Sequence, residues 1–190
     1  HGICVGKDFM FGHNRDGNFQ SLQKLGQKLG FISYGLQPVI LDDQVISSTR
    51  IRTALSEGKI DDANQMLGRK FSIEGPVVKG DGKGREIGFA TANLDTKGLI
   101  LPPNGVYAAY AQLNGHKFKA LLNIGVRPTI KQSPSSLQVE THLLNFNDNI
   151  YDEVIEIEFI SRLRNELMFN STEALKKQIS SDIEHAKTLF

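Results

Sequence analysis

The pattern that most constrains the fold is a series of β-rich runs, separated by turn residues, that begins after Gly68. Asn114-Gly115 joins two of these runs, and this dipeptide is a strong signal of a tight hairpin. In Val154–Phe159 strict alternation places two glutamates on one face of a strand. The runs are residues 71–79, 105–113, 117–126, 137–146 and 154–163. Turn residues between the runs, with a hairpin signal at one of them, predict antiparallel strands.

One amphipathic helix follows the last β-rich run. Asn170, with Glu173 three residues later, predicts its N-cap. Its apolar residues recur at helical spacing, at Leu175, Ile179, Ile183 and Ala186. Five or six antiparallel strands followed by one helix predict a small β-barrel with the helix packed on it.

Residues before Gly68 have a different pattern. Apolar runs at Ile3–Val5 and within residues 31–41 predict strands, whereas Asn18 and Ser48 are placed to cap helices. Alternating strands and helices predict an α/β unit. We therefore divide the chain into an α/β part, residues 1–67, and a barrel part, residues 68–190.

Composition and charge exclude several classes of protein. The formal net charge is +1, whereas a general nucleic-acid binder carries a clear basic excess. No apolar run approaches the roughly 18 residues that predict a membrane-spanning helix. Cys4 is the only cysteine, so no internal disulfide can form, and a cytoplasmic protein is expected.

The densest signal for chemistry is the glycine-rich segment Gly80–Leu94, which also carries Lys83 and Arg85. Alternating glycines let backbone N–H groups curl around an anion such as a polyphosphate, although a flexible hairpin turn has the same composition. Gly84-Arg85-Glu86 does not match a Walker loop, and Phe89–Leu94 does not open a helix as a Rossmann loop does.

Polar side chains near and beyond this segment are candidates for catalysis. Thr91 and Asn93, two residues apart on an extended segment, either hold a hard cation such as Mg²⁺ or satisfy backbone groups in a turn. Strand alternation places Glu140 and His142 on one face, either as a proton acceptor with a neighbour or as a solvated surface. No second histidine or cysteine stands at zinc-ligand spacing from His142. Ile46–Arg52 opens a helix, and its start is either an anion site or a simple N-cap.

The order of these motifs resembles that of riboflavin kinases, and the first part resembles the end of the adenylyltransferase module of bacterial bifunctional riboflavin kinase/FAD synthetases. The resemblance implies a mainly β fold with α: a six-stranded antiparallel barrel of the riboflavin-kinase type with a C-terminal helix. A fragment of an α/β, Rossmann-like nucleotidyltransferase domain is implied before it. The matching segments are Val5–Gly12, Ile46–Arg52, Gly80–Leu94, Pro103–Tyr107, Asn123–Thr129, Val139–His142 and Leu163–Phe169.

The resemblance also implies an activity: transfer of the γ-phosphate of ATP, with Mg²⁺, to the ribityl 5′-hydroxyl of riboflavin, which gives FMN and ADP. Glu140 is implied as the catalytic base, and Thr91 and Asn93 as the pair that meets Mg²⁺ and the phosphates. Arg164 and Phe169 match positions near the flavin. The implied nucleotide clamp is Gly80, Gly82, Lys83, Gly84, Arg85 and Gly88, and the further matching motif supplies Asn123, Arg127 and Thr129.

Two departures from the family pattern modify these expectations. Ala90 stands where the family usually has proline, which would stiffen the turn that presents Thr91. The chain opens at His1 without methionine, and the histidine motif of the adenylyltransferase has no match in it. We expect that the beginning of a longer protein is missing and that this chain alone does not form FAD, whereas the longer protein would.

Two other classes of protein share the β pattern. A non-catalytic flavin-binding barrel is the main alternative, although it leaves the glycine-rich segment with Thr91 and Asn93 unexplained. An oligonucleotide-binding barrel usually places exposed aromatic side chains in a basic groove. The near-neutral charge and the absence of tryptophan argue against that class.

Overall fold

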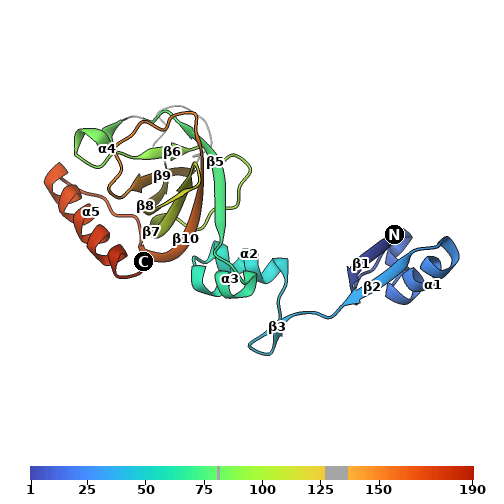
Figure 1. Cartoon of the computed structure of the whole chain (residues 1–190). Helices are drawn as coiled ribbons and strands as arrows, with labels where there is room; N and C mark the ends of the chain where they lie inside the picture. Colours follow the sequence, from blue (N-terminus) through green and yellow to red (C-terminus); the bar gives the residue numbers. More distant parts are fainter. Residues whose placement is uncertain (81, 127–136) are drawn as a thin grey trace. The chain divides into compact units, whose positions relative to one another are not determined.

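The computed structural model describes residues 1–80, 82–126 and 137–190. It forms two compact units, His1–Ser47 and Ser48–Phe190, both drawn in Figure 1. Two helices, α2 (Ser48–Ser56) and α3 (Ile60–Leu67), therefore belong to the same unit as the barrel. The sequence-based assignment of residues 48–67 to the adenylyltransferase part stays a prediction.

The first unit contains a parallel β-α-β arrangement, which confirms the α/β pattern expected there. Strands β1 (Gly2–Gly6) and β2 (Ile32–Leu36) pair in parallel, and α1 (Phe19–Leu29) connects them. Asn18 Oδ1 accepts a hydrogen bond from Ser21 N at 3.0 Å, so the predicted N-cap is confirmed. The remaining elements are a short 3₁₀ turn (His13–Arg15), β3 (Ile40–Leu41) and β4 (Gln44–Val45).

The second unit is built on a closed barrel of six strands in the order β10-β5-β6-β9-β8-β7 (Figure 1). Every neighbouring pair is antiparallel, as predicted. Each of the five predicted runs overlaps one strand, and two of these strands extend one residue beyond their runs. The sixth strand, β6, has only three residues. The strands are β5 (Ser72–Val78), β6 (Ala92–Leu94), β7 (Gly105–Leu113), β8 (His116–Val126), β9 (Leu137–Leu143) and β10 (Val154–Arg164).

Burial alternates along β5, β9 and the first part of β10, so that one face of these strands fills the barrel interior. On β9, Val139 and Thr141 point into the barrel and are fully buried, whereas Glu140 and His142 are only partly buried. On β10, Phe159 packs edge-on against Tyr107 with ring centroids 5.5 Å apart. Each fully buried aliphatic side chain stabilises the fold by about 1.5–3 kcal/mol relative to an exposed one. The barrel wall is therefore a rigid support for the residues on its outer face.

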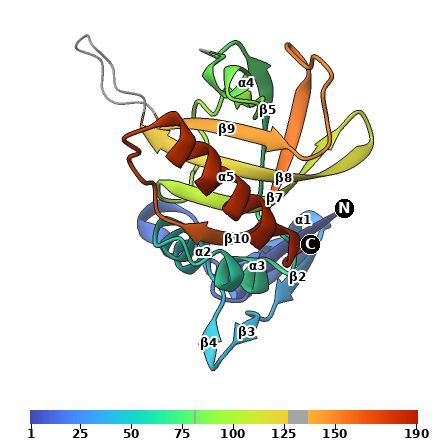
Figure 2. The same ribbon diagram turned by 90° about the vertical axis from the view of Figure 1, so that its left-hand side faces the viewer.

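The C-terminal helix α5 (Thr172–Lys187) lies across the outside of the barrel (Figure 2). Val106 and Leu121 on the outer face of the sheet are buried together with Ala186 of the helix. The N-cap is Ser171, whose hydroxyl accepts a hydrogen bond from Ala174 N at 3.1 Å, so the predicted cap at Asn170 is wrong by one residue. Serine and asparagine are equally suitable caps, and the sequence alone does not separate neighbouring candidates.

Helices α2 and α3 extend the same core. Leu55 and Ile60 are buried in one cluster with the barrel interior. Asn64 connects α3 to β10 and to the residue just before β5: its Nδ2 donates to Phe159 O at 3.2 Å, and its Oδ1 accepts from Phe71 N at 2.6 Å. This partly buried amide thus pairs with a backbone carbonyl of β10 and with the backbone N–H just before β5.

One ion pair on the outer face of the barrel gives a pH-dependent prediction. Lys117 Nζ lies 2.6 Å from Glu158, and this hydrogen bond, followed by one from Gln112, holds the pKa of Glu158 below its ordinary value of 4.5. A lowered pKa stabilises the folded state above pH 4.5, and that contribution is lost as the pH falls through the folded-state pKa. We expect Lys117→Met to lower the free energy of unfolding by less than about 1 kcal/mol at pH 7. Urea titrations should show this difference vanishing in acid; a difference that grows below pH 4.5 would contradict it.

Candidate functional site

A row of polar side chains crosses the outer face of the barrel at one level. Glu140 on β9 lies opposite Asn93 on β6 and Asn123 on β8. Asn123 pairs with Val106 on β7, and Val106 pairs with Arg164 at the end of β10. Directly opposed residues on neighbouring strands share a face, so a carboxylate stands between two amides with a guanidinium at the far end of the row.

Two cavities of the barrel unit share Thr91 in their linings. The row of polar side chains forms part of the floor of the larger cavity, which has a volume of about 540 Å³. Glu140, Asn123 and His142 contribute polar groups, whereas most of the walls are apolar. The walls come from the segment after α4 (Lys83–Glu86), from the segment after β10 and from α5. Their apolar side chains are Ile87, Phe89, Leu167, Phe169, Leu175 and Ile179. Such a cavity suits a flat, largely apolar ligand that carries a polar end.

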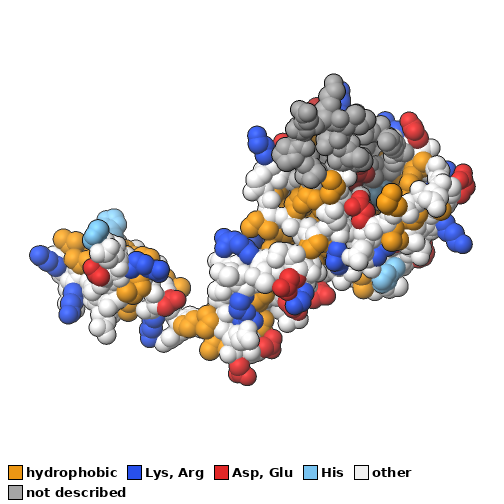
Figure 3. Space-filling view, turned by 180° about the vertical axis from the view of Figure 1, so that it is seen from behind, with side chains coloured by type: hydrophobic (Ala, Val, Ile, Leu, Met, Phe, Trp, Pro, Cys, Tyr) orange, Lys and Arg blue, Asp and Glu red, His pale blue; other side chains and the backbone are white. Residues whose placement is uncertain are grey.

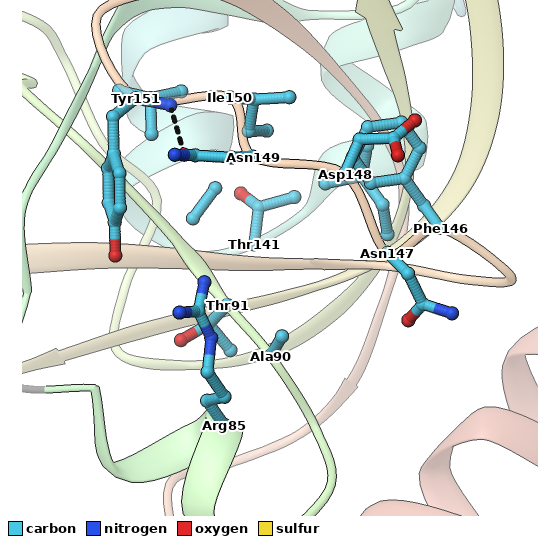
Figure 4. Close-up of a pocket in the computed structure, with 13 residues that line it drawn as sticks. Arg85, Ala90, Thr91, Thr141, Phe146, Asn147, Asp148, Asn149, Ile150 and Tyr151 are labelled. Atoms are coloured by element: carbon cyan, nitrogen blue, oxygen red, sulfur yellow. Dashed lines mark hydrogen bonds between the residues drawn. The ribbon is translucent and has the colours of Figure 1, made fainter.

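The smaller cavity, about 460 Å³, has a different lining (Figure 4). Arg85 reaches into it from α4, and Thr91 lies on the same side. The opposite wall is the loop between β9 and β10, where Tyr151 N donates to Asn149 Oδ1 at 3.1 Å. The loop residues that line it are Phe146, Asn147, Asp148, Asn149, Ile150 and Tyr151. Thr91 lines both cavities and therefore stands at their junction.

The glycine-rich segment packs directly on the two predicted metal-binding residues. A Cβ at Gly80 would collide with the side chain of Asn93, and one at Gly84 would lie 3.2 Å from Thr91 Oγ1 and collide with Phe89 O. Asn93 is only 7% exposed, and its Oδ1 accepts a hydrogen bond from Gln138. The glycines are thus required for close approach of the backbone, in addition to any role at a ligand.

Thr91 and Asn93 supply a hydroxyl and an amide oxygen, which are hard oxygen donors of the kind that Mg²⁺ prefers. The segment that packs on Thr91 and Asn93 also contains Arg85, whose side chain lies in the smaller cavity beside Thr91. The residues present therefore fit a magnesium ion that accompanies a polyphosphate. Among the described residues, no cluster of three histidine, cysteine, aspartate or glutamate side chains forms another metal site.

Arg164 is held by a buried ion pair with Asp182 of α5. Its Nε lies 3.0 Å from both carboxylate oxygens, and its Nη2 lies 2.7 Å from Oδ2. Gln178 donates a further bond to the carboxylate at 2.8 Å, and the guanidinium lies 6.0 Å from the centre of the Phe169 ring. The pair fixes α5 against the end of β10 and forms one corner of the larger cavity.

The predicted site residues fall into three groups. The structure gathers Gly84, Thr91, Glu140, Asn123, Arg164 and Phe169 around the larger cavity, and Arg85 and Thr91 around the smaller one. Gly80 and Asn93 contact each other and line neither cavity, although Asn93 lies directly opposite Glu140. Gly82 and Gly88 adopt positive φ angles of 74° and 90° on either side of α4. Arg127, Thr129 and the side chain of Lys83 lie outside what the structure describes.

Sequence reasoning missed several residues of the site. Asp182 was hidden as one charged residue on an amphipathic helix, and nothing in the sequence links it to Arg164. Asn147–Tyr151 has the composition of an ordinary turn, so its place in a cavity wall has no sequence signal. The glycine-rich segment also forms one turn of helix at α4, which the glycine spacing did not predict. These features depend on contacts between segments distant in the sequence.

The buried hydroxyl of Thr141, which lines the smaller cavity, gives a prediction about the stability of the fold. Thr141 Oγ1 is buried and has no hydrogen-bond partner among the described residues. A buried unsatisfied hydroxyl costs about 1–3 kcal/mol. We expect Thr141→Val, which keeps the branched shape, to raise the free energy of unfolding by about 1 kcal/mol in urea titrations without ligand. A loss of 1 kcal/mol or more would show that the hydroxyl has a partner in solution.

Comparison with models of protein families shows to which family the chain belongs. The model of the riboflavin kinase family matches residues 67–190, which include all six strands of the barrel, both cavities and α5. The chain belongs to the riboflavin kinase family. A second model, FAD synthetase, matches residues 1–50, within the part where the adenylyltransferase resemblance was found.

Relatives of known name agree with this assignment. The chain is 42% identical over 189 residues to the bifunctional riboflavin kinase/FMN adenylyltransferase of Haemophilus influenzae, covering 99% of this chain and 61% of that protein. The protein of the same name from Escherichia coli K12 is 39% identical, and the match covers 99% of this chain and 60% of that protein. The one from Bacillus subtilis is 37% identical, and the match covers 98% of this chain and 59% of that protein. The chain therefore spans about three fifths of the length of these relatives.

A solved structure shares the fold. A crystal structure described as a macrolide-efflux protein from Streptococcus pneumoniae matches with a TM-score of 0.84 and 29% identity, covering 96% of this chain and 58% of that one.

No helix among the described residues of this chain has the length and apolar character needed to cross a membrane. On the face shown in Figure 3, basic and acidic side chains of the described residues are interspersed rather than gathered into a single-sign area.

Proposed function

We propose that this chain phosphorylates riboflavin: it transfers the γ-phosphate of ATP to the ribityl 5′-hydroxyl and releases FMN and ADP. The observation that carries the proposal is the position of Thr91 between two cavities, with the Glu140 carboxylate lining the larger cavity beside it. Membership of the riboflavin kinase family supports it independently. A barrel that only stored a flavin would not need a second, arginine-bearing cavity at the end of the first.

The larger cavity takes the flavin, and the smaller one takes the nucleotide. Phe89, Leu167 and Phe169 offer apolar surface to the flat isoalloxazine ring, and the ribityl chain runs over the polar row toward Glu140. In the smaller cavity, Arg85 lies beside Thr91, where a phosphate group gains from its positive charge. The glycine-rich segment adds backbone N–H groups at the same end.

Glu140 accepts the proton of the ribityl hydroxyl while the new O–P bond forms and the bond from the γ-phosphorus to the ADP oxygen breaks. The transition state of phosphoryl transfer is loose, so a carboxylate of ordinary basicity is sufficient, and positioning supplies most of the catalysis. Asn93 and Asn123, directly opposite Glu140 on the neighbouring strands, orient the carboxylate or the phosphate with their amide groups.

Thr91 and Asn93 would hold Mg²⁺ through their side-chain oxygens. Bound there, the ion would supply positive charge that offsets the charge developing on the transferring phosphate. Arg164 contributes chiefly through its pair with Asp182, because the guanidinium has three bonds to that carboxylate and holds the corner of the cavity where the flavin binds.

The match of residues 1–50 to the FAD synthetase model supports a second activity, adenylylation of FMN to FAD, for any longer protein that contains this chain. The single cysteine and the phosphorylated metabolites that both reactions use fit a cytoplasmic enzyme.

The proposal is tested by incubating the chain with riboflavin, ATP and Mg²⁺ and separating the flavins by chromatography. We expect FMN and ADP to accumulate in equal amounts, and no FMN to form when ATP is omitted. Saturable riboflavin binding without any FMN would contradict the proposal and favour the non-catalytic flavin-binding barrel.

A further inference from the structure

The segment that carries Thr91 leaves the barrel just where the two cavities meet. Strand β6 pairs with β9 only over Ala92–Leu94, and Ala92 opposite Thr141 is the last pair. Thr91, which would lie opposite His142, falls outside the ladder. Backbone pairing therefore does not fix Thr91 relative to β9, although phosphoryl transfer depends on fixed positions.

The side chain of His142 replaces the missing ladder contacts. Its Nδ1 lies 2.7 Å from Ala90 O, and because a carbonyl oxygen only accepts, Nδ1 carries the proton and donates. The imidazole also meets the Phe89 ring edge-on, with centroids 5.7 Å apart and planes at 77°. Phe89 N in turn donates to Gly84 O at 2.8 Å. The side chain of His142 thus connects β9 to Phe89 and Ala90, the two residues that directly precede Thr91.

The same strand carries Glu140 two residues before His142, on the same outer face. A rigid β-strand therefore holds both the carboxylate at the flavin end and the contact that places Thr91 at the nucleotide end. Movement of Ala90 away from β9 would widen the gap between the attacking hydroxyl and the phosphate. This coupling is the kind of geometric support that a transfer reaction requires.

We infer that His142 is a positioning residue that holds Thr91 in register with Glu140 through the Ala90 carbonyl. The inference rests on the proposed kinase activity for its kinetic consequences, and on the hydrogen bond to Ala90 for its geometry. His142 is neither the base nor a metal ligand in this role. What matters is one N–H donor at the position of Nδ1.

Two substitutions separate the donor from the ring. His142→Phe keeps an aromatic ring against Phe89 and removes the donor. His142→Asn loses the ring, but its side-chain amide nitrogen can stand close to the position of Nδ1. His116→Phe and His116→Asn, made at an exposed histidine beside the Asn114-Gly115 turn, are the matched controls.

We expect His142→Phe to raise the KM for ATP·Mg²⁺ about tenfold and to lower kcat, because Thr91 is no longer held. His142→Asn should keep the KM for ATP·Mg²⁺ within about threefold of the unmodified chain. The affinity for ADP with Mg²⁺, measured by calorimetry, should follow the same order. Equal impairment of both variants, or of neither, would overturn the inference.

Two further measurements test the role of His142 independently of the kinase assay. If the unmodified chain forms no FMN, the proposed function fails, whereas the calorimetric order of the variants still tests His142. ¹⁵N NMR of the unmodified chain should show His142 with a protonated Nδ1 at neutral pH. A neutral ring with its proton on Nε2 alone would overturn the inference without any substitution.

Discussion

Replacing Glu140 with glutamine is expected to lower kcat for FMN formation at least about 100-fold, the usual contribution of a positioned proton acceptor. Glutamine has the same shape but cannot accept the hydroxyl proton. The KM for ATP should stay within about threefold, because the carboxylate acts at the flavin end of the site. Steady-state kinetics of the variant, together with calorimetric binding of ADP, measure both effects.

The control for this variant is Glu156→Gln on β10. Glu156 is also a partly buried glutamate on the outer face of a strand, opposite Glu74 on β5, but it lines neither cavity. Its loss should leave kcat unchanged. Turnover of Glu140→Gln within about threefold of the unmodified chain would remove Glu140 as the base.

The second large effect concerns the ion pair between Arg164 and Asp182. Replacing Asp182 with leucine leaves a largely buried guanidinium without its carboxylate, and the side chains are only 18% and 6% exposed. We expect this to lower the free energy of unfolding by about 3 kcal/mol, since breaking one half of a buried pair leaves an uncompensated charge. Urea unfolding measures the loss. Riboflavin should also bind more weakly, because α5 forms a wall of the larger cavity.

The double substitution Arg164→Leu with Asp182→Leu distinguishes an ion pair from general packing. Removing both charges abolishes the desolvation penalty as well as the attraction, so the double variant should be more stable than either single one. Losses that simply add, or single losses below about 1 kcal/mol, would show that the pair does not hold α5 on the barrel.

Much of the barrel could be predicted because its strands obey local rules. Alternation along β9 placed Glu140 and His142 on one face, and the structure shows both partly buried above the fully buried Val139 and Thr141. The Asn114-Gly115 turn was read correctly from two residues, with Asn114 and Gly115 both at positive φ. Such features depend on neighbours in sequence, so periodicity and turn chemistry are enough to find them.

The arrangement of the site could not be predicted in the same way. Strand β6 is too short to show a period, yet it brings Asn93 beside Glu140. Asp182 meets Arg164 across 18 positions of sequence, and the contact between His142 and Ala90 spans 52. The two cavities arise only when these distant segments are packed together. The motifs indicated which residues to consider, and the register of the barrel decides which of them meet.

A crystal structure of the chain with ADP, Mg²⁺ and FMN tests most directly whether the two cavities hold the nucleotide and the flavin. We expect ADP in the smaller cavity beside Arg85, with its phosphates at Thr91, and the isoalloxazine ring in the larger cavity with the FMN phosphate next to Glu140. A nucleotide bound away from Thr91 and Arg85, or a flavin whose phosphate lies far from Glu140, would contradict this expectation.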